Sequence, residues 1–404
     1  MTGLDATSDW GLIDPGAADP TGTADDAVLA AMVDVERALL RAWGSELDEF
    51  LDPQADALDA AALVADPGTR TALRDGVRRD GVPVVALVPA LRAQLEAARL
   101  ATDRLHLGAT SQDVVDTALM LVARRVLGAT RDSLVATGRK LAVLADAERG
   151  SIRMARTVAR HAEASTLGVL AAGWLDGVGS AVETIDALRY PVQFGGAVGT
   201  GTAADATAGR GGASDTVRAA LAAKLGLDDP GRAWHAERTA VVAIAAASAS
   251  AVAALGRIGG DAVQLSREEI GEVRLATAGG SSAMPHKRNP VDAVAITAAA
   301  VEAPAHLQIL ASAAIAGDER SAGRWHAEWP ALRRLVRLAR SSGIAAERLV
   351  AGLEFDRERA AAIVAGSGAA GTGPDREVLV AASDRLVDHA LARFTRIADR
   401  SEQP

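Results

Sequence analysis

A polar stretch between two apolar runs, GGSSAMPHKRNPVDAV (residues 279–294), holds the side chains best suited to chemistry. Ser281 and Ser282 supply hydroxyls, and Lys287 and Arg288 supply positive charge. Nearby cations make a serine easier to deprotonate, and such a serine can remove or return a proton at a carbon next to a carboxylate. The same cations would stabilise the enolate-like dianion between the two steps. The stretch therefore predicts proton transfer on a carboxylate substrate; the structural alternative is a linker or a solvated charge run.

Another polar island, LHLGATSQDVVDTA (residues 105–118), lies where a helix is expected to begin. Helix ends offer free backbone donors for anions, so this is a suitable place for a substrate carboxylate. His106, Thr110 and Ser111 are its candidate site residues. Thr110 or Ser111 can equally serve as the helix cap, with Asp113 in the first turn.

Two more islands and one supporting stretch complete the candidate site. RTVARHAEASTLG (residues 156–168) carries His161, which could instead cap a helix or pair with Glu163. PVQFGGAVGTGTAA (residues 191–204) is dense in glycine, which indicates close backbone approach or a tightly packed turn. DERSAGRWHAEWPAL (residues 318–332) is unusually polar for a helix surface. Its charged and imidazole side chains include Arg320, Arg324, His326 and Glu328.

The composition excludes several classes of protein. The chain has 404 residues, enough for two or three domains, with 49% hydrophobic and 24% charged residues. It has no cysteine, which excludes disulfides, thiolate nucleophiles and zinc–thiolate sites. The formal net charge is -9 and the basic residues are scattered, which argues against a nucleic-acid surface. Neither a signal peptide nor a window of about twenty uncharged apolar residues is visible, so we expect a cytoplasmic protein without a membrane span.

The spacing of alanine, leucine and valine predicts an almost entirely α-helical fold, because alternating strand-like stretches are scarce. The predicted long helices cover residues 28–47, 109–128, 165–190, 238–265, 290–315 and 375–394. Gly128 is expected to end the second of them, and a glycine-rich joint at residues 365–374 precedes the last. Several of these helices are apolar around most of their circumference, so we expect a bundle enlarged by association of subunits.

Together, the polar islands resemble the motifs of the fumarase/aspartase superfamily, which includes adenylosuccinate and argininosuccinate lyases. GGSSAMPHKRNP matches its long and specific signature, GSSxMPxKxN, and the other islands follow the family's order over residues 25–354. Within the superfamily, the chain most resembles bacterial 3-carboxy-cis,cis-muconate cycloisomerases, which lactonise a product of protocatechuate ring cleavage in the β-ketoadipate pathway. The stretches that carry this resemblance are GATSQDVVDTALM, AAGWLDG, PVQFGGAVGT, SSAMPHKRNPV and GRWHAEWPAL.

The resemblance implies an all-α fold of three helical domains and a homotetramer whose active sites take residues from several subunits. We therefore expect an amino-terminal helical domain at residues 1–105 and a central long-helix bundle with the signature loop at residues 106–345. A shortened carboxy-terminal helical domain is expected at residues 346–404. The implied substrate is a small di- or tricarboxylate, and the chemistry requires neither a metal nor a cofactor.

Roles for individual residues also follow from the resemblance. Ser282 matches the serine that transfers the proton, with Ser281 beside it, and His161 and His106 match the histidines of the family's motifs. The residues expected to bind the substrate are Thr110, Ser111, Gln112, Met284, His286, Lys287, Arg288 and Asn289.

One departure from the family concerns the leaving group. In adenylosuccinate lyase the second motif resembles RTHGxHAE, and its first histidine protonates the departing nitrogen; this chain has Val158 there. An amine-type leaving group needs a proton, whereas a carboxylate with a pKa of about 4 leaves as a stable anion. The sequence therefore favours a cycloisomerase. A substrate carboxylate adds to an alkene, Lys287 holds the resulting aci-carboxylate, and Ser282 delivers the proton to carbon.

Three alternatives stay open at this point. Nitrite is also a weak base, so a lyase that releases fumarate from nitrosuccinate would equally lack the leaving-group acid. Adenylosuccinate lyase is a further enzymatic alternative. The superfamily also supplies structural lens proteins, but the retained Ser282, Lys287 and Asn289 argue against a non-catalytic protein.

Overall fold

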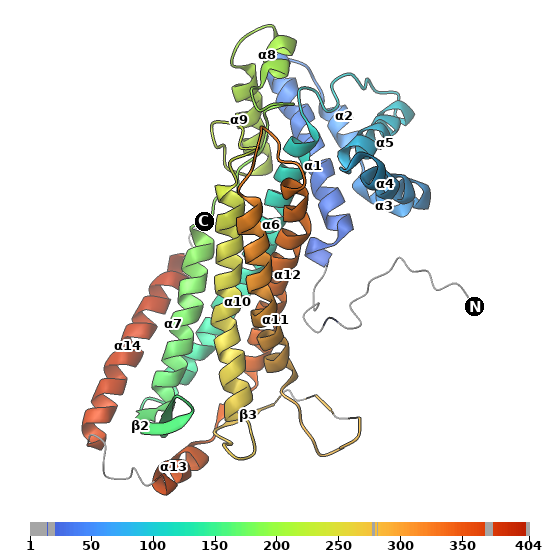
Figure 1. Cartoon of the computed structure of the whole chain (residues 1–404). Helices are drawn as coiled ribbons and strands as arrows, with labels where there is room; N and C mark the ends of the chain where they lie inside the picture. Colours follow the sequence, from blue (N-terminus) through green and yellow to red (C-terminus); the bar gives the residue numbers. More distant parts are fainter. Residues whose placement is uncertain (1–13, 15–20, 277–278, 281, 368–374, 401–404) are drawn as a thin grey trace.

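Long α-helices that run side by side form the centre of the molecule, and shorter helices lie around its two ends (Figure 1). The computed structural model describes residues 14, 21–276, 279–280, 282–367 and 375–400. The long helices of the bundle are α6 (Ser111–Ala147), α7 (Leu167–Asp186), α10 (Thr239–Leu265), α11 (Val291–Ala313) and α12 (Arg324–Ala351). The predicted all-α fold is confirmed.

The remaining helices are shorter or lie on the outside of the bundle. Those near the amino terminus are η1 (Thr21–Thr23), α1 (Asp25–Leu47), α2 (Asp52–Ala57), α3 (Ala60–Ala65), α4 (Pro67–Asp80) and α5 (Val84–Ala97). The others are α8 (Thr202–Ala208), α9 (Ala213–Leu225), α13 (Arg357–Gly366) and α14 (Arg376–Arg400). The predicted last helix is confirmed as α14, which packs along α7 (Figure 1). Residues 368–374 of the predicted joint lie outside the described residues.

Short antiparallel strand pairs lie at one end of the bundle, near α13. The first pair, β1 (Ile152–Thr157) and β2 (Arg160–Thr166), is a hairpin between α6 and α7. In the second pair, β3 (Val273–Leu275) joins β4 (Leu353–Phe355). This second pairing fixes the segment that follows α10 beside the end of α12, and so anchors the start of the signature loop.

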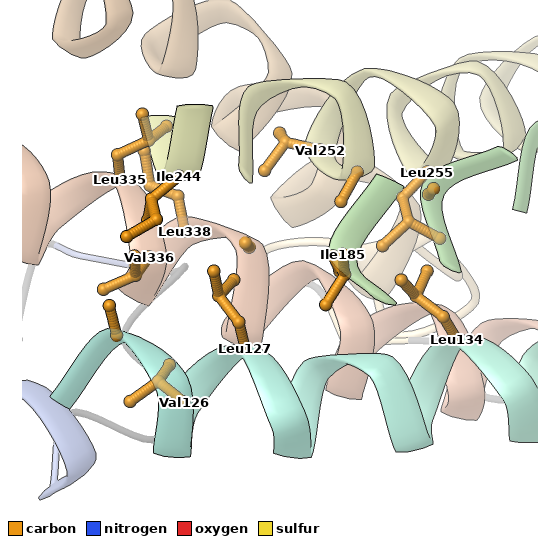
Figure 2. Close-up of a cluster of buried hydrophobic side chains, with 14 of the residues drawn as sticks. Val126, Leu127, Leu134, Ile185, Ile244, Val252, Leu255, Leu335, Val336 and Leu338 are labelled. Carbon is orange, nitrogen blue, oxygen red and sulfur yellow. The ribbon is translucent and has the colours of Figure 1, made fainter. Parts of the chain in front are cut away.

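Apolar side chains from α6, α7, α10 and α12 meet in the bundle core, as Figure 2 shows. Its labelled members are Val126, Leu127, Leu134, Ile185, Ile244, Val252, Leu255, Leu335, Val336 and Leu338. Small residues bring neighbouring helices close together. A Cβ placed on Gly256 of α10 would lie 2.6 Å from the Cβ of Ala300 on α11, so only glycine permits this approach. The alanine-rich composition therefore serves tight helix packing.

The expectation that Gly128 ends a helix is wrong, because α6 continues without a break to Ala147. Glycine weakens a helix interior by about 1 kcal/mol relative to alanine, which is a weak preference. Here Leu127, Leu134 and Leu141 are fully buried on both sides of the glycine, and their packing outweighs that preference. The start of this helix was predicted correctly: Thr110 is its cap, with Asp113 in the first turn.

Contrary to the expectation that no such apolar window exists, two helices, α10 and α11, are long and apolar enough to cross a membrane by length and composition alone. Here they pack against each other and against α12 in the bundle. The exposed side of α11 is nevertheless apolar, with Val294 half exposed and Val301 79% exposed. Together with Ile309 these residues follow helical spacing and form one stripe, which we call the α11 stripe.

The bundle has two chemically distinct ends. Helix α6 begins at one of them, beside α8 and α9, and its far end leads into the β1–β2 hairpin (Figure 1). The signature loop, between α10 and α11, lies at the hairpin end. Because α6 has 37 residues, the two ends are about 55 Å apart at 1.5 Å of rise per residue. We call them the α6 end and the loop end.

Candidate active site

Asp113 ties the segments of the α6 end together. Its buried carboxylate accepts hydrogen bonds from the backbone N–H groups of Thr110 (2.9 Å), Gly195 (3.1 Å) and Gly196 (3.0 Å). His235 Nε2 lies 2.8 Å from the same carboxylate. The Asp113 side chain therefore holds the polar island at residues 105–118 in contact with the glycine-dense island at residues 191–204. This contact explains Gly195 and Gly196, because their backbone must approach the carboxylate closely.

Beneath this contact lies a network of buried charges. The Arg238 guanidinium lies between the carboxylates of Asp116 (2.8 Å) and Glu328 (2.5 Å). Burial alone would lower the pKa of Arg238, but the two carboxylates outweigh it and raise that pKa. Burial also raises the pKa of Glu328, against the opposing effect of Arg238. Trp325 Nε1 donates to Asp116 at 2.9 Å, so α6, α10 and α12 are joined by polar contacts within the apolar bundle.

The predicted substrate-binding residues of the α6 end differ in accessibility. Thr110 and Ser111 are partly exposed at the start of α6. Gln112 is fully buried, and its amide donates to Asp116 (3.1 Å) and to the backbone carbonyl of His235 (3.0 Å). Within the described residues, the structure thus places Thr110 and Ser111 where a ligand can reach them and Gln112 in the supporting network.

Arg320 brings a cation to Thr110. Its guanidinium donates to Thr110 Oγ1 at 2.7 Å and to the carbonyl of Ala197 at 3.3 Å. It forms no ion pair with any carboxylate among residues 21–276, 279–280, 282–367 and 375–400. A partly exposed guanidinium beside a hydroxyl and a helix start suits an incoming carboxylate.

His106 is the remaining candidate at the α6 end. It precedes the start of α6 with a φ of 60°, a left-handed conformation that is uncommon for any residue but glycine. Its Nδ1 lies 2.6 Å from Oε1 of Glu36, on α1, and its side chain is 20% exposed. Burial by itself would lower the pKa of His106, but the hydrogen bond and charge of Glu36 outweigh it, so the pKa is raised.

At the loop end, a short backbone contact closes the base of the signature loop. The N–H of Gly279 donates to the carbonyl of Asn289 and the N–H of Asn289 donates back to Gly279, both at 2.9 Å. The Asn289 side chain donates to the carbonyl of Gly280 at 3.0 Å. Ser281 lies outside the described residues. The predicted site residues exposed on the loop are Ser282, Met284, His286, Lys287 and Arg288.

The β1–β2 hairpin presents the second motif at the same end of the bundle (Figure 1). His161 is exposed on β2, and no ion pair joins it to Glu163 among the residues that the structure describes. Val158 and Ala159 form the tip of the hairpin, both with positive φ (50° and 61°). Val158 is 98% exposed.

Glu272 connects the hairpin to the segment that leads into the signature loop. Its carboxylate is fully buried and accepts two hydrogen bonds from Arg156 (3.0 and 3.1 Å) and one from Arg153 (3.2 Å). A buried carboxylate with two guanidinium partners is a strong constraint, because a movement that separated it from both would leave an uncompensated buried charge. The hairpin that carries the second motif is therefore tied to the segment that precedes the signature loop.

One chain does not bring all the predicted residues together. His106, Thr110, Ser111 and Gln112 belong to the α6 end, whereas His161 and residues 282–289 belong to the loop end, about 55 Å away along α6. A small carboxylate cannot span that distance. Within the described chain there is also no group of three or more His, Asp or Glu side chains arranged to hold a metal ion.

Sequence reasoning missed several supporting residues, of which Glu36, Arg238 and Glu272 matter most. For one of them, Glu36, the sequence does contain an indication of its role. Glu36 lies four residues after Met32 and three before Leu39, so it falls on the apolar, buried face of α1. An acidic residue in such a position needs a partner, and here that partner is His106.

Comparisons with known proteins find relatives among lyases and cycloisomerases. A family model described as lyase matches residues 84–304. The chain is 40% identical over 367 residues to nitrosuccinate lyase of Streptomyces davaonensis, covering 88% of this chain and 77% of the relative. It is 37% identical over 342 residues to 3-carboxy-cis,cis-muconate cycloisomerase of Pseudomonas aeruginosa, covering 83% of this chain and 73% of the relative.

A solved structure is similar over nearly the whole chain. The crystal structure of 3-carboxy-cis,cis-muconate lactonizing enzyme from Pseudomonas putida superposes with a TM-score of 0.79 at 29% sequence identity. The match covers 96% of this chain and 98% of that one. The fold is therefore shared over nearly the whole chain.

Proposed function

The chain belongs to the fumarase/aspartase superfamily of lyases, and from that premise we propose that it is a 3-carboxy-cis,cis-muconate cycloisomerase. The observation that carries the proposal is Val158, an apolar, exposed side chain at the hairpin tip where a basic leaving group would need an acid; it narrows the reaction to a weakly basic attacking or leaving group. A carboxylate is a weak base and needs no acid when it adds or departs. Similarity to cycloisomerases from several bacteria supports this choice.

The proposed reaction is an addition within one substrate molecule. A substrate carboxylate oxygen attacks the alkene and forms the lactone C–O bond, while the alkene electrons move toward a second carboxylate to give an aci-carboxylate. The Ser282 hydroxyl then gives its proton to carbon, which restores that carboxylate. Lys287 and Arg288 carry the positive charge that stabilises the dianion and the serine oxyanion.

Substrate orientation is the proposed task of the α6 end. Thr110 and Ser111 offer hydroxyls at the start of α6, and His106 offers an imidazole beside them. These groups would hold the carboxylate that does not react. Holding it in a fixed place converts the addition into a step between prepositioned groups, which is a large part of the rate enhancement in such reactions.

Association of subunits is required to bring the two ends together. We infer a cytoplasmic homotetramer in which the loop end of one chain lies against the α6 end of another. The α11 stripe supports this inference, because a helix with exposed Val294, Val301 and Ile309 calls for an apolar partner. Light scattering should give about four times the 41.3 kDa mass of the chain.

A second candidate function is elimination of nitrite from nitrosuccinate. The identity of 40% over 88% of the chain to a nitrosuccinate lyase favours it. Nitrite, like a carboxylate, leaves without an acid, so Val158 is compatible with both reactions. In this alternative Ser282 removes a proton from carbon rather than delivering one.

A direct comparison of substrates separates these candidates. Purified protein is incubated with 3-carboxy-cis,cis-muconate while the diene absorbance is followed, and with nitrosuccinate while nitrite and fumarate are measured. Loss of the diene with formation of the lactone supports the cycloisomerase. Nitrite and fumarate in equal amounts, with no lactone, would replace it by the lyase. If a folded tetramer turned over neither substrate, both candidate functions would be contradicted.

A further inference from the structure

A buried carboxylate outside every motif lies directly against His106. Glu36 projects from α1 with its side chain 0% exposed, and its Oε1 is 2.6 Å from His106 Nδ1. Its other oxygen, Oε2, is buried without a hydrogen-bond partner among the described residues. A carboxylate so fully removed from water with one unused oxygen is costly to the fold. We therefore expect the buried Glu36 carboxylate to have a role, and the side chain that it contacts is His106.

Helix α1 holds the His106 segment at a second point as well. Trp43, seven residues after Glu36 and on the same face of the helix, donates from Nε1 to the carbonyl of Leu107 at 2.9 Å. One contact thus fixes the backbone and the other fixes the imidazole. Together they maintain the left-handed conformation of His106, which its own backbone preference opposes.

We propose that Glu36 is a positioning residue that holds His106 with its Nε2 directed to a substrate carboxylate. The proposal rests on the proposed function, in which the α6 end binds that carboxylate. A carboxylate only accepts hydrogen bonds, so Nδ1 of His106 must carry the proton in this pair. Nε2 has no partner among the described residues. In the imidazolium form it is a donor that suits a carboxylate; in the neutral form it is an acceptor that repels one.

The charges around His106 favour the imidazolium. Burial lowers its pKa, whereas Glu36 on α1 and, from farther away, Asp113 on α6 raise it. Arg92 on α5 opposes them, and the pKa is raised overall. A raised pKa means that the proton is bound more tightly in the folded protein. The imidazolium is therefore present up to a pH above its ordinary pKa of about 6.5 and is lost as pH rises through the folded value.

Chemical modification of the whole, substrate-free protein tests the proposal. Diethyl pyrocarbonate reacts with neutral imidazole, and peptide mass spectrometry resolves the modification of each of the seven histidines. In the wild type, the pH midpoint for His106 should lie above about 6.5. In Glu36→Gln, which keeps an acceptor for Nδ1 but removes the charge, the midpoint should fall by about one unit, which raises the modification rate about tenfold at pH values well below both midpoints.

A matched control is available on α11, where Glu302 lies 3.0 Å from His306. Glu302→Gln removes another histidine–glutamate contact and should leave the His106 midpoint unchanged. A His106 midpoint at or below about 6.5 in the wild type would overturn the proposal without any variant. An unchanged midpoint in folded Glu36→Gln would also overturn it. The pH midpoints of His106 modification are measured without substrate. They therefore test the role of Glu36 even if the protein does not catalyse the proposed reaction.

Kinetics then separate positioning from mere structural support. Glu36→Gln should raise KM about tenfold with a smaller change in kcat, because the lost interaction is with bound substrate. In a His106→Gln background the same substitution should have no further effect on KM, since Glu36 acts through His106. Additive effects of the two substitutions would show that Glu36 acts elsewhere and would contradict the proposal.

Discussion

The two ends of the bundle carry equally dense chemistry but are built in opposite ways. At the α6 end, Asp113, Asp116, Arg238 and Glu328 are buried and paired, and they hold partly exposed Thr110 in place. At the loop end, the candidate groups are exposed, and the buried carboxylates that are paired, Glu272 at the base of the hairpin and Glu148 with Arg357, lie outside the signature loop. The contrast teaches that the α6 end is rigidly organised in the folded chain, which suits the substrate orientation that we propose for it. The other end presents its candidate groups to solvent, and in the proposed function a substrate and another chain cover them.

Removal of the reactive hydroxyl should give the largest effect on turnover. Ser282→Ala should lower kcat about a thousandfold, because positioned acid–base groups contribute two to four orders of magnitude. The side chain is exposed, so the thermal midpoint should not change. Ser45→Ala, at an exposed serine on α1, is the matched control and should keep full activity. Normal kcat in the Ser282 variant would remove the loop end from the proposed chemistry.

Removal of a buried cation should have its main effect on stability instead. Arg238→Gln leaves Asp116 and Glu328 without their partner and should cost about 3 kcal/mol of unfolding free energy. Lys287→Gln makes the same exchange at an exposed cation and should cost less than about 0.5 kcal/mol. Urea midpoints at a fixed protein concentration compare the two variants. Equal losses of unfolding free energy in the two variants would contradict the contrast between buried, paired charges at the α6 end and exposed charges at the loop end.

Relief of backbone strain at the loop end should give the smallest effect. Val158→Gly removes the cost of a β-branched residue at a φ of 50° and should raise stability by about 0.5–1 kcal/mol. Turnover should fall several-fold if the valine contacts the substrate, as its place at the family's leaving-group acid position implies. Ala159→Gly, next to it at a φ of 61°, should give the stability gain with full turnover. If both variants keep full turnover, Val158 is part of the turn alone.

Much of the fold could be predicted from the sequence because helix signals are local. The apolar spacing of α1, α7, α10 and α11 and the Thr110 cap with Asp113 were sufficient to predict those helices. Gly128 misled because its unfavourable helix preference is small beside the packing of its neighbours. The β1–β2 hairpin was missed because polar side chains at an exposed turn carry little periodicity.

The candidate residues could be named from the sequence, but their arrangement could not. Ser282 and His106 follow from motifs, whereas their separation by the length of α6 appears only in the folded chain. Partners far apart in sequence, such as Glu36 with His106 or Glu272 with Arg156, have no local pattern that joins them. An acidic residue on a buried helix face was the available clue, and it indicates a partner without naming it.

The central claim is that one active site takes its two halves from different chains, and complementation tests it most directly. His106→Gln and Ser282→Ala chains carrying different tags are coexpressed, and tetramers containing both are purified. Each variant alone should be nearly inactive. Mixed tetramers should recover about a quarter of wild-type turnover of 3-carboxy-cis,cis-muconate, since random pairing leaves that share of sites with both intact residues. Mixed tetramers no more active than the single variants would contradict the shared site.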